Sequence, residues 1–132
     1  MFDIASLRTD EKLEVEGVVR QLGGGAFIKV ARENNDNYVR EITDLVEANR
    51  ELLDSGTPEA QELDKQLVIE AMAKTILVDF EVALDGKKLK YSFENAVKVL
   101  SDNKDFRRLV VAESRKFENY KLAKEKKQGK NS

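Results

Sequence analysis

Residues 73–96, which read AKTILVDFEVALDGKKLKYSFENA, decide the architecture that we expect of this chain. The apolar run at residues 76–78, resumed at Phe80, continues the helix-like pattern before it, so we expect a buried helix end here. Asp85-Gly86 marks a turn, and Ser92 is placed to cap a new helix with its side-chain oxygen. The stretch therefore predicts a helix that ends in the core, a turn, and a second helix.

Two helices are predicted upstream of this stretch, over about residues 35–54 and 58–80. The run of Asn and Asp at residues 34–37 offers N-caps for the first helix. Thr57-Pro58 opens the second helix with a capping hydroxyl and a proline at the first helical position. Because the connection between the two helices is short, we expect them to form an antiparallel pair.

The N-terminal part of the chain predicts a β-hairpin over about residues 12–32. Apolar residues alternate with polar ones over residues 13–20, three glycines follow at residues 23–25, and residues 26–31 are a second β-prone run. Glycine supplies the positive φ angles that a tight hairpin turn needs. Since an isolated two-stranded hairpin is marginally stable in water, this one is expected to pack on the helices.

The C-terminal part predicts helices over about residues 93–101 and 103–122, the second of them capped by Ser101-Asp102. We therefore expect an α+β fold that is mainly α-helical, with the N-terminal β-hairpin packed on a small bundle of about four helices. Residues 1–122 are expected to form a single globular domain, followed by a basic tail at residues 123–132.

The charge of the chain is unevenly distributed. Residues 115–130 hold seven basic and two acidic residues, a net of +5, which leaves −7 for the rest of a chain whose formal charge is −2. Such a tail either contacts an acidic partner or nucleic acid, or is a solvated helix end, and we favour the solvated end. The N-terminus has neither a basic region nor a long apolar run, so we expect a cytosolic protein that makes no membrane contact.

The composition argues against an enzyme. The chain contains no cysteine and no histidine, which removes thiolate chemistry, the commonest general base and the commonest transition-metal ligand. The acid pairs Glu14 with Glu16 and Asp79 with Glu81 are more simply explained as exposed flanks of a strand and a helix end. The glycine run lacks the following helix and lysine of a phosphate-binding loop. We therefore expect no catalytic residue, no metal and no cofactor.

Asp79 is the one charge inside the apolar run at residues 76–80. A buried lone carboxylate is costly, so Asp79 either points outward, caps the following turn, or pairs with a basic group of a partner chain. Lys74, Arg107 and Arg108 are the candidate partners within the chain. The sequence leaves these alternatives open.

Five short motifs occur in order along the chain: LEVEGV at residues 13–18, NNDNY at 34–38, ILVDF at 76–80, YSFENA at 91–96 and Asp105-Phe106. In this order they resemble the tail assembly chaperones of long-tailed (siphovirus-type) bacteriophages. The resemblance covers roughly residues 5–120, and Phe80 departs from it because family members often carry tryptophan there.

The resemblance implies a non-enzymatic helper that acts in the host bacterial cytoplasm and is absent from the mature virion. Such proteins bind and solubilise the tape-measure protein and help to recruit tail-tube subunits. Broad apolar helix faces suit that task, and self-association is a further possibility. We expect an exposed apolar groove with Asp79 beside it. Its candidate partner-binding residues are Ile69, Met72, Ile76, Leu77, Asp79, Phe80, Phe106 and Val110.

Two other functions are consistent with the sequence. One is a structural tail or connector component that forms symmetric oligomers. The other, less favoured, is a nucleic-acid-binding regulator that uses the basic tail.

Overall fold

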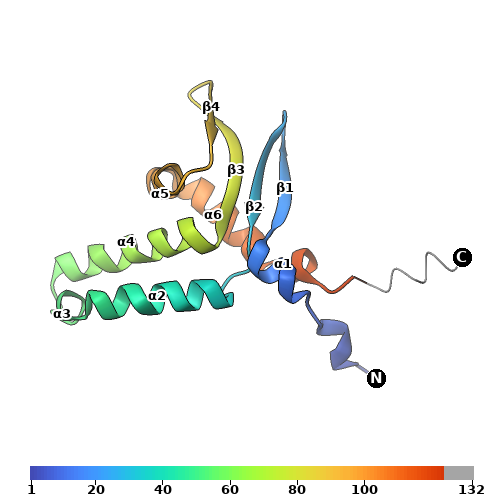
Figure 1. Ribbon diagram of the computed structural model, residues 1–132, viewed down its shortest axis with the longest axis horizontal. Coiled ribbons are helices and arrows are strands. Elements are labelled where there is room, and N and C mark those ends of the chain that lie inside the picture. The colour runs from blue at the N-terminus through green and yellow to red at the C-terminus, as the bar shows by residue number, and fades with distance from the viewer. Residues whose placement is uncertain (124–132) are drawn as a thin grey trace, which may run out of the picture.

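One antiparallel sheet of four strands, in the order β1-β2-β3-β4, forms the centre of the fold (Figure 1). The computed structural model describes residues 1–123 of the 132-residue chain. Residues 124–132, which are nearly all of the predicted basic tail at 123–132, therefore lie outside the described residues. The strands are β1 Val18–Gly23, β2 Ala26–Val30, β3 Leu77–Leu84 and β4 Lys87–Lys90.

Seven α-helices and one short 3-10 helix complete the described part of the chain, so the predicted class, α+β and mainly helical, is confirmed. No helix within residues 1–123 is long and apolar enough to cross a membrane. The α-helices are α1 Glu11–Glu16, α2 Asp36–Ala48, α3 Arg50–Leu53, α4 Pro58–Thr75, α5 Phe93–Asp102, α6 Lys104–Arg115 and α7 Phe117–Tyr120; the 3-10 helix is Ile4–Leu7.

Two tight turns build the sheet from two hairpins. Gly24 and Gly25 both have positive φ angles at the β1–β2 turn, so the predicted glycine hairpin is confirmed, although it spans a shorter stretch than residues 12–32. Asp85 and Gly86, with φ angles of 52° and 78°, make the equivalent turn between β3 and β4. The expected turn is present, but it joins two strands rather than two helices.

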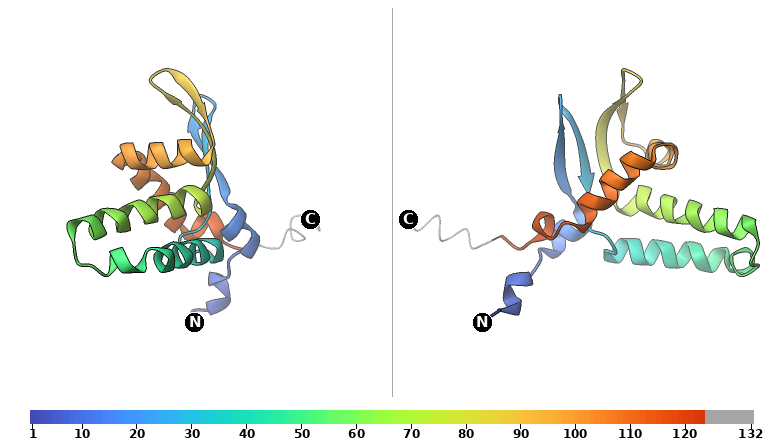
Figure 2. Two further views of the ribbon diagram at one scale, coloured as in Figure 1. Left: turned by 60° about the vertical axis from the view of Figure 1, so that its left-hand side comes forward. Right: turned by 180° about the vertical axis from the view of Figure 1, so that it is seen from behind.

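The central strands β2 and β3 bring the core together. Ile28 on β2 lies directly opposite Phe80 on β3, and both side chains are buried. Helices α4, α5 and α6 pack against this face of the sheet (Figures 1 and 2). The buried core cluster is Ile28, Val30, Met72, Ala73, Ile76, Leu77, Phe80, Ala96, Val99, Leu100 and Val110.

The prediction that residues 76–80 end a helix is wrong, because α4 stops at Thr75 and the run becomes strand β3. The Asn35 side-chain amide donates a 3.1 Å hydrogen bond to the Thr75 carbonyl, which satisfies one of the orphan carbonyls at the end of α4. A mostly apolar run without a clear period fits a strand covered by helices as well as it fits a buried helix. The predicted hairpin on a helix bundle is therefore a four-stranded sheet with helices against one face.

The strand predicted over residues 13–20 begins late, because residues 11–16 form α1. The Asp10 carboxylate caps this helix by accepting hydrogen bonds from the backbone nitrogens of Lys12 and Leu13 at 2.9 and 3.2 Å. Gly17, with φ of 91°, then turns the chain into β1. The alternating apolar pattern here belongs to one short helix followed by a strand.

The single helix predicted over residues 103–122 is also divided. Asn103, rather than Ser101 or Asp102, caps α6 through a 2.9 Å hydrogen bond from the Phe106 nitrogen to its side-chain oxygen. The chain leaves the helical conformation at Lys116, and α7 follows as one short turn. The caps predicted at Thr57 and Ser92 are confirmed, since their hydroxyls accept from the backbone three residues on.

Helices α2 and α4 form the expected antiparallel pair and project away from the sheet (Figures 1 and 2). Helix α3 lies at the far end of the projection and connects them. We call α2, α3 and α4 together the helical arm. The base of the arm, where α2 begins and α4 ends, is near the core: Met72 and Ala73 of α4 are core residues, and Tyr38 of α2 packs against the core cluster.

Candidate functional site

Most of the predicted partner-binding residues are core residues. Met72 and Ile76 are 5% exposed, and three others, Leu77, Phe80 and Val110, are at most 1% exposed. The prediction that these five line an exposed groove is wrong: Leu77 and Phe80 lie on the central strand β3, and Met72, Ile76 and Val110 pack in the same buried cluster. These side chains stabilise the fold and are not accessible to a partner.

The other three predicted residues lie at different places. Ile69 and Phe106 are half-buried and pack against the edge of the core. Asp79 is exposed, as the outward-pointing alternative required, and its carboxylate accepts a 2.9 Å hydrogen bond from the Phe80 nitrogen. The residue opposite Asp79 on β2 is Lys29, which is not one of the three partners proposed for Asp79 within the chain. Those candidates contact other groups: Lys74 pairs with Glu41, Arg107 with the Leu100 carbonyl and Arg108 with Asp105.

Phe106 contributes to an apolar groove that lies between the tip of the β1–β2 hairpin, the outer end of β3, and the junction of α5 with α6. Pairing of β2 with β3 stops at Phe27 and Glu81, while β3 continues to Leu84, so the hairpins diverge beyond this point (Figure 2). The groove has a volume of about 410 Å³. We call it the tip groove; it is lined by Leu22, Ala26, Val82, Ala83, Leu84, Lys98, Val99, Asp102, Asn103 and Phe106.

The helical arm presents a second incompletely covered apolar surface. Helix α2 has an apolar stripe, yet none of its residues is buried. The reason is that α3 and α4 are the elements that pack extensively against it. Ile42 and Val46 in the stripe are half-buried, and Val39 beside them is 48% exposed. A hollow of about 540 Å³ lies between the end of α2 and the start of α4, beside Val46, Leu53 and Ala60.

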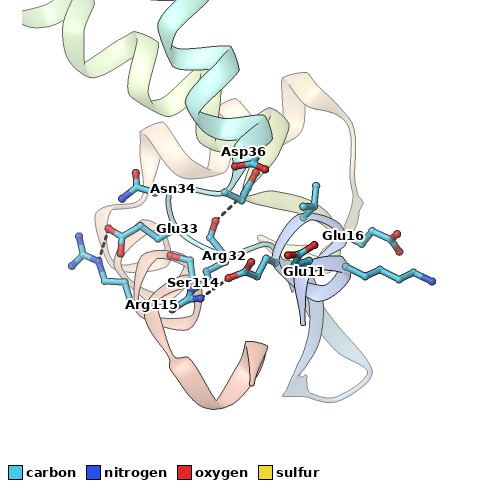
Figure 3. Close-up of a pocket in the computed structure, with 12 residues that line it drawn as sticks. Glu11, Glu16, Arg32, Glu33, Asn34, Asp36, Ser114 and Arg115 are labelled. Atoms are coloured by element: carbon cyan, nitrogen blue, oxygen red, sulfur yellow. Dashed lines mark hydrogen bonds and ion pairs between the residues drawn. The ribbon is translucent and has the colours of Figure 1, made fainter. Parts of the chain in front are cut away.

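A polar cleft of about 830 Å³ lies between α1, the loop from β2 to α2, and the end of α6 (Figure 3). Two ion pairs bridge the elements around the cleft: Arg32 of the loop binds Glu14 of α1, and Arg115 of α6 lies 3.0 Å from Glu33 of the loop. Within residues 1–123, no group of three or more carboxylates is arranged to hold a metal ion. The cleft therefore has the character of an ion-paired junction between elements.

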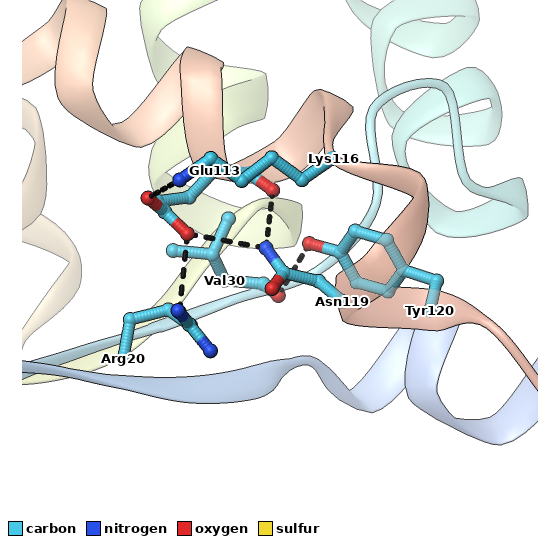
Figure 4. A network of polar contacts seen from close by, with 6 residues as sticks. All are labelled: Arg20, Val30, Glu113, Lys116, Asn119 and Tyr120. Atoms are coloured by element: carbon cyan, nitrogen blue, oxygen red, sulfur yellow. Dashed lines mark hydrogen bonds and ion pairs between the residues drawn. The ribbon is translucent and has the colours of Figure 1, made fainter. Parts of the chain in front are cut away.

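A polar network centred on the buried Glu113 ties α6 and α7 to the sheet (Figure 4). The Glu113 carboxylate lies 3.1 Å from Arg20 on β1 and 2.6 Å from Lys116, and it accepts a 3.2 Å hydrogen bond from Asn119. Burial alone would raise the pKa of Glu113, but the hydrogen bonds from Lys116 and Asn119 and the nearby positive charges outweigh it and hold the pKa below its ordinary value. Every charge in the network has a partner, so the network is structural.

The surfaces that the sequence reasoning missed are the tip groove and the flank of the arm. The signal for the groove was Asp85-Gly86, since Asp-Gly between two β-prone runs is a strong hairpin pattern. The corresponding signal for the arm is that Tyr38, Ile42, Leu45 and Val46 recur at helical spacing and form one apolar stripe. How much of that stripe stays uncovered depends on the tertiary arrangement.

Comparison with known proteins identifies the origin of the chain. A family model described as YdaY prophage protein matches residues 31–131, about three quarters of the 132 residues. The searches of curated proteins and of solved structures returned no match. The matched region contains the helical arm, the β3–β4 hairpin, and helices α5 to α7. The chain is therefore of phage origin and belongs to the YdaY prophage protein family.

Proposed function

We propose that this protein is a non-enzymatic phage tail assembly chaperone, which binds and solubilises the tape-measure protein and helps to recruit tail-tube subunits. Its phage origin supports this function, and so does the order of short motifs that resembles such chaperones. The proposal includes action in the host cytoplasm and absence from the finished virion.

The observation that carries the proposal is the half-covered flank of the helical arm. Two antiparallel helices with an uncovered apolar strip accept a third amphipathic helix in the way that helical bundles are completed. The strip runs along Val39, Ile42 and Val46 and leads into the hollow beside Leu53 and Ala60. Long helical segments of a tape-measure protein are partners of this shape and chemistry.

Co-expression with the tape-measure protein of the same phage tests the proposal. The wild-type chain is expected to keep that protein in the soluble fraction and to co-purify with it. Val39→Glu places a charge on the strip and is expected to reduce the co-purified amount about tenfold or more, as for a central contact of an interface. Val19→Glu is the matched control, because Val19 on β1 is also 48% exposed but lies away from the arm.

Three results would contradict the proposal. The tape-measure protein could stay insoluble with the wild-type chain, or both valine variants could behave alike. Mass spectrometry of purified particles could also find the protein in stoichiometric amounts in mature virions, which would indicate a structural tail component instead.

A further inference from the structure

The two ends of the molecule carry opposite charge. The outer half of the helical arm, residues 44–65, holds seven acidic and two basic residues, a net of −5. The segment that forms one side of the tip groove and its surroundings, residues 84–108, holds seven basic and four acidic residues, a net of +3. Complementary charge of this kind orients two partners as they meet.

The same two ends are complementary in shape. Leu52 on α3 stands at the far end of the arm and is 44% exposed, with the acidic side chain of Glu51 next to it in the chain. The tip groove is concave and apolar, and the leucines at its mouth, Leu22 and Leu84, are 39% and 38% exposed. Lys98 and Asp102 both line the groove, and the wider segment around it carries the net positive charge given above. An exposed leucine flanked by acids therefore matches an apolar groove with a lysine beside it.

We propose that the tip groove binds the arm tip of a second copy of this chain. Leu52 of one copy enters the groove beside Leu84 of the next, and Glu51 approaches Lys98. Figures 1 and 2 show α3 well away from the strand tips, so an arm does not reach the groove of its own copy. The contact joins two different surfaces, and copies add head to tail. The inference is independent of the proposed function.

Sedimentation velocity of the full chain at increasing concentration tests the self-association. The wild-type protein is expected to grow from monomer to dimer and longer species. Raising the NaCl concentration from about 50 mM to about 500 mM is expected to weaken the association about tenfold, because the charge attraction is screened. A wild-type protein that stays monomeric up to the highest soluble concentration overturns the proposal.

A mixing experiment tests the head-to-tail geometry. Leu52→Asp removes the apolar side chain at the arm tip, and Leu84→Asp places a charge in the apolar groove. Each variant alone is therefore expected to be monomeric. Mixed in equal amounts, they are expected to form a 1:1 dimer that grows no further, because one intact arm and one intact groove remain. Failure of the mixture to dimerise, or unchanged assembly of either variant alone, overturns the proposal.

Matched controls separate the contact from general effects of a new charge. Leu122→Asp and Leu109→Asp alter leucines that are 46% and 36% exposed and lie outside both surfaces, so they are expected to assemble like the wild type. If an aspartate variant loses its circular dichroism spectrum, Lys98→Glu takes its place, since Lys98 is exposed. Lys98→Glu is expected to weaken assembly, and Glu51→Lys in the same chain is expected to restore it.

The same variants show whether another chain fills the groove. Suppose that the wild-type protein is monomeric and Leu84→Asp, but not Leu109→Asp, reduces co-purification of the tape-measure protein. The groove then belongs to that partner, and the self-association proposal is overturned while the proposed function stands. If Val39→Glu alone reduces co-purification, the tape-measure protein binds the arm flank and not the groove. The sedimentation experiment then decides the head-to-tail proposal.

Discussion

The Tyr120 hydroxyl donates a 2.8 Å hydrogen bond to the backbone carbonyl of Val30, which joins α7 to the central strand β2 across 90 residues of sequence. Tyr120 is fully buried, and this burial raises the pKa of its phenol well above the ordinary value. The side chain therefore stays a neutral hydrogen-bond donor throughout the pH range in which the protein would be studied. It fixes the C-terminal helices on the sheet.

Replacing Tyr120 by phenylalanine is expected to lower the free energy of unfolding by about 1–2 kcal/mol, because the Val30 carbonyl is left buried without its donor. Urea unfolding followed by circular dichroism measures the change. Tyr38→Phe is the control, since the Tyr38 hydroxyl makes no hydrogen bond to any residue among 1–123. Equal losses in the two variants would show that the hydrogen bond contributes little.

Gly17→Ala is expected to destabilise the protein by about 2–4 kcal/mol, because strain at a positive φ combines with a steric clash. The φ angle is 91°, and an added Cβ would lie 3.0 Å from the Val30 carbonyl carbon. Gly24→Ala separates the two causes, since Gly24 also has a positive φ but open space around it. Thermal unfolding of both variants gives the comparison, and a smaller loss for Gly17→Ala than for Gly24→Ala would contradict the crowding.

The lowered pKa of Glu113 predicts a pH-dependent stability. Because the folded protein holds this pKa below its ordinary value of 4.5, the carboxylate stabilises the fold fully above that value. The contribution is lost as the pH falls through the lower pKa of the folded state. Glu113→Gln does not titrate, so its free energy of unfolding is expected to fall less between about pH 5 and pH 3.

The same Glu113→Gln variant is expected to be about 1–2 kcal/mol less stable than the wild type at pH 7, because it loses charge-assisted hydrogen bonds. Urea unfolding at a series of pH values measures both effects. Glu118→Gln, at an exposed position on α7, serves as the control. A wild-type slope that persists in Glu113→Gln would assign the acid sensitivity to other carboxylates.

Phe80→Ala is expected to cost about 3–5 kcal/mol of stability, as for a large aromatic residue removed from a core. Phe80 is 1% exposed and packs edge-on against Tyr91, with ring centroids 5.6 Å apart. Phe93→Ala, at a phenylalanine that is 39% exposed, is expected to cost much less. Melting temperatures of the two variants test this assignment of Phe80 to the core, and a mild effect at Phe80 would return it to the candidate partner surface.

Local rules identified several features from the sequence alone. The hydroxyls of Thr57 and Ser92 cap helices as their positions indicated, and the glycines after β1 make the expected hairpin turn. These features depend on a few neighbouring residues, so a sequence pattern is sufficient to find them. Each of them also matched the structure to within a few residues.

Features that depend on distant residues were not predictable in the same way. The run at residues 76–80 is apolar except for Asp79, a pattern that fits a buried helix or a strand, and its pairing with β2 makes it a strand. Burial of Leu77 and Phe80, which removed them from the candidate surface, follows from that pairing and from the helices above it. The exposure of Val39 likewise depends on the tertiary arrangement, because the elements with extensive contacts to α2 are α3 and α4 and neither covers this side chain.

The position of β2 has a consequence for the boundaries of this protein. The region that matches the family starts at residue 31, directly after β2 ends at Val30. Yet β2 lies in the middle of the sheet, where Ile28 and Val30 cover Phe80 and Leu77. A fragment cut at the family boundary would lack β1 and β2, so it would expose a row of unpaired backbone groups on β3 and the side chains of Phe80 and Leu77. The region of this chain that matches the family model is therefore smaller than the unit that folds.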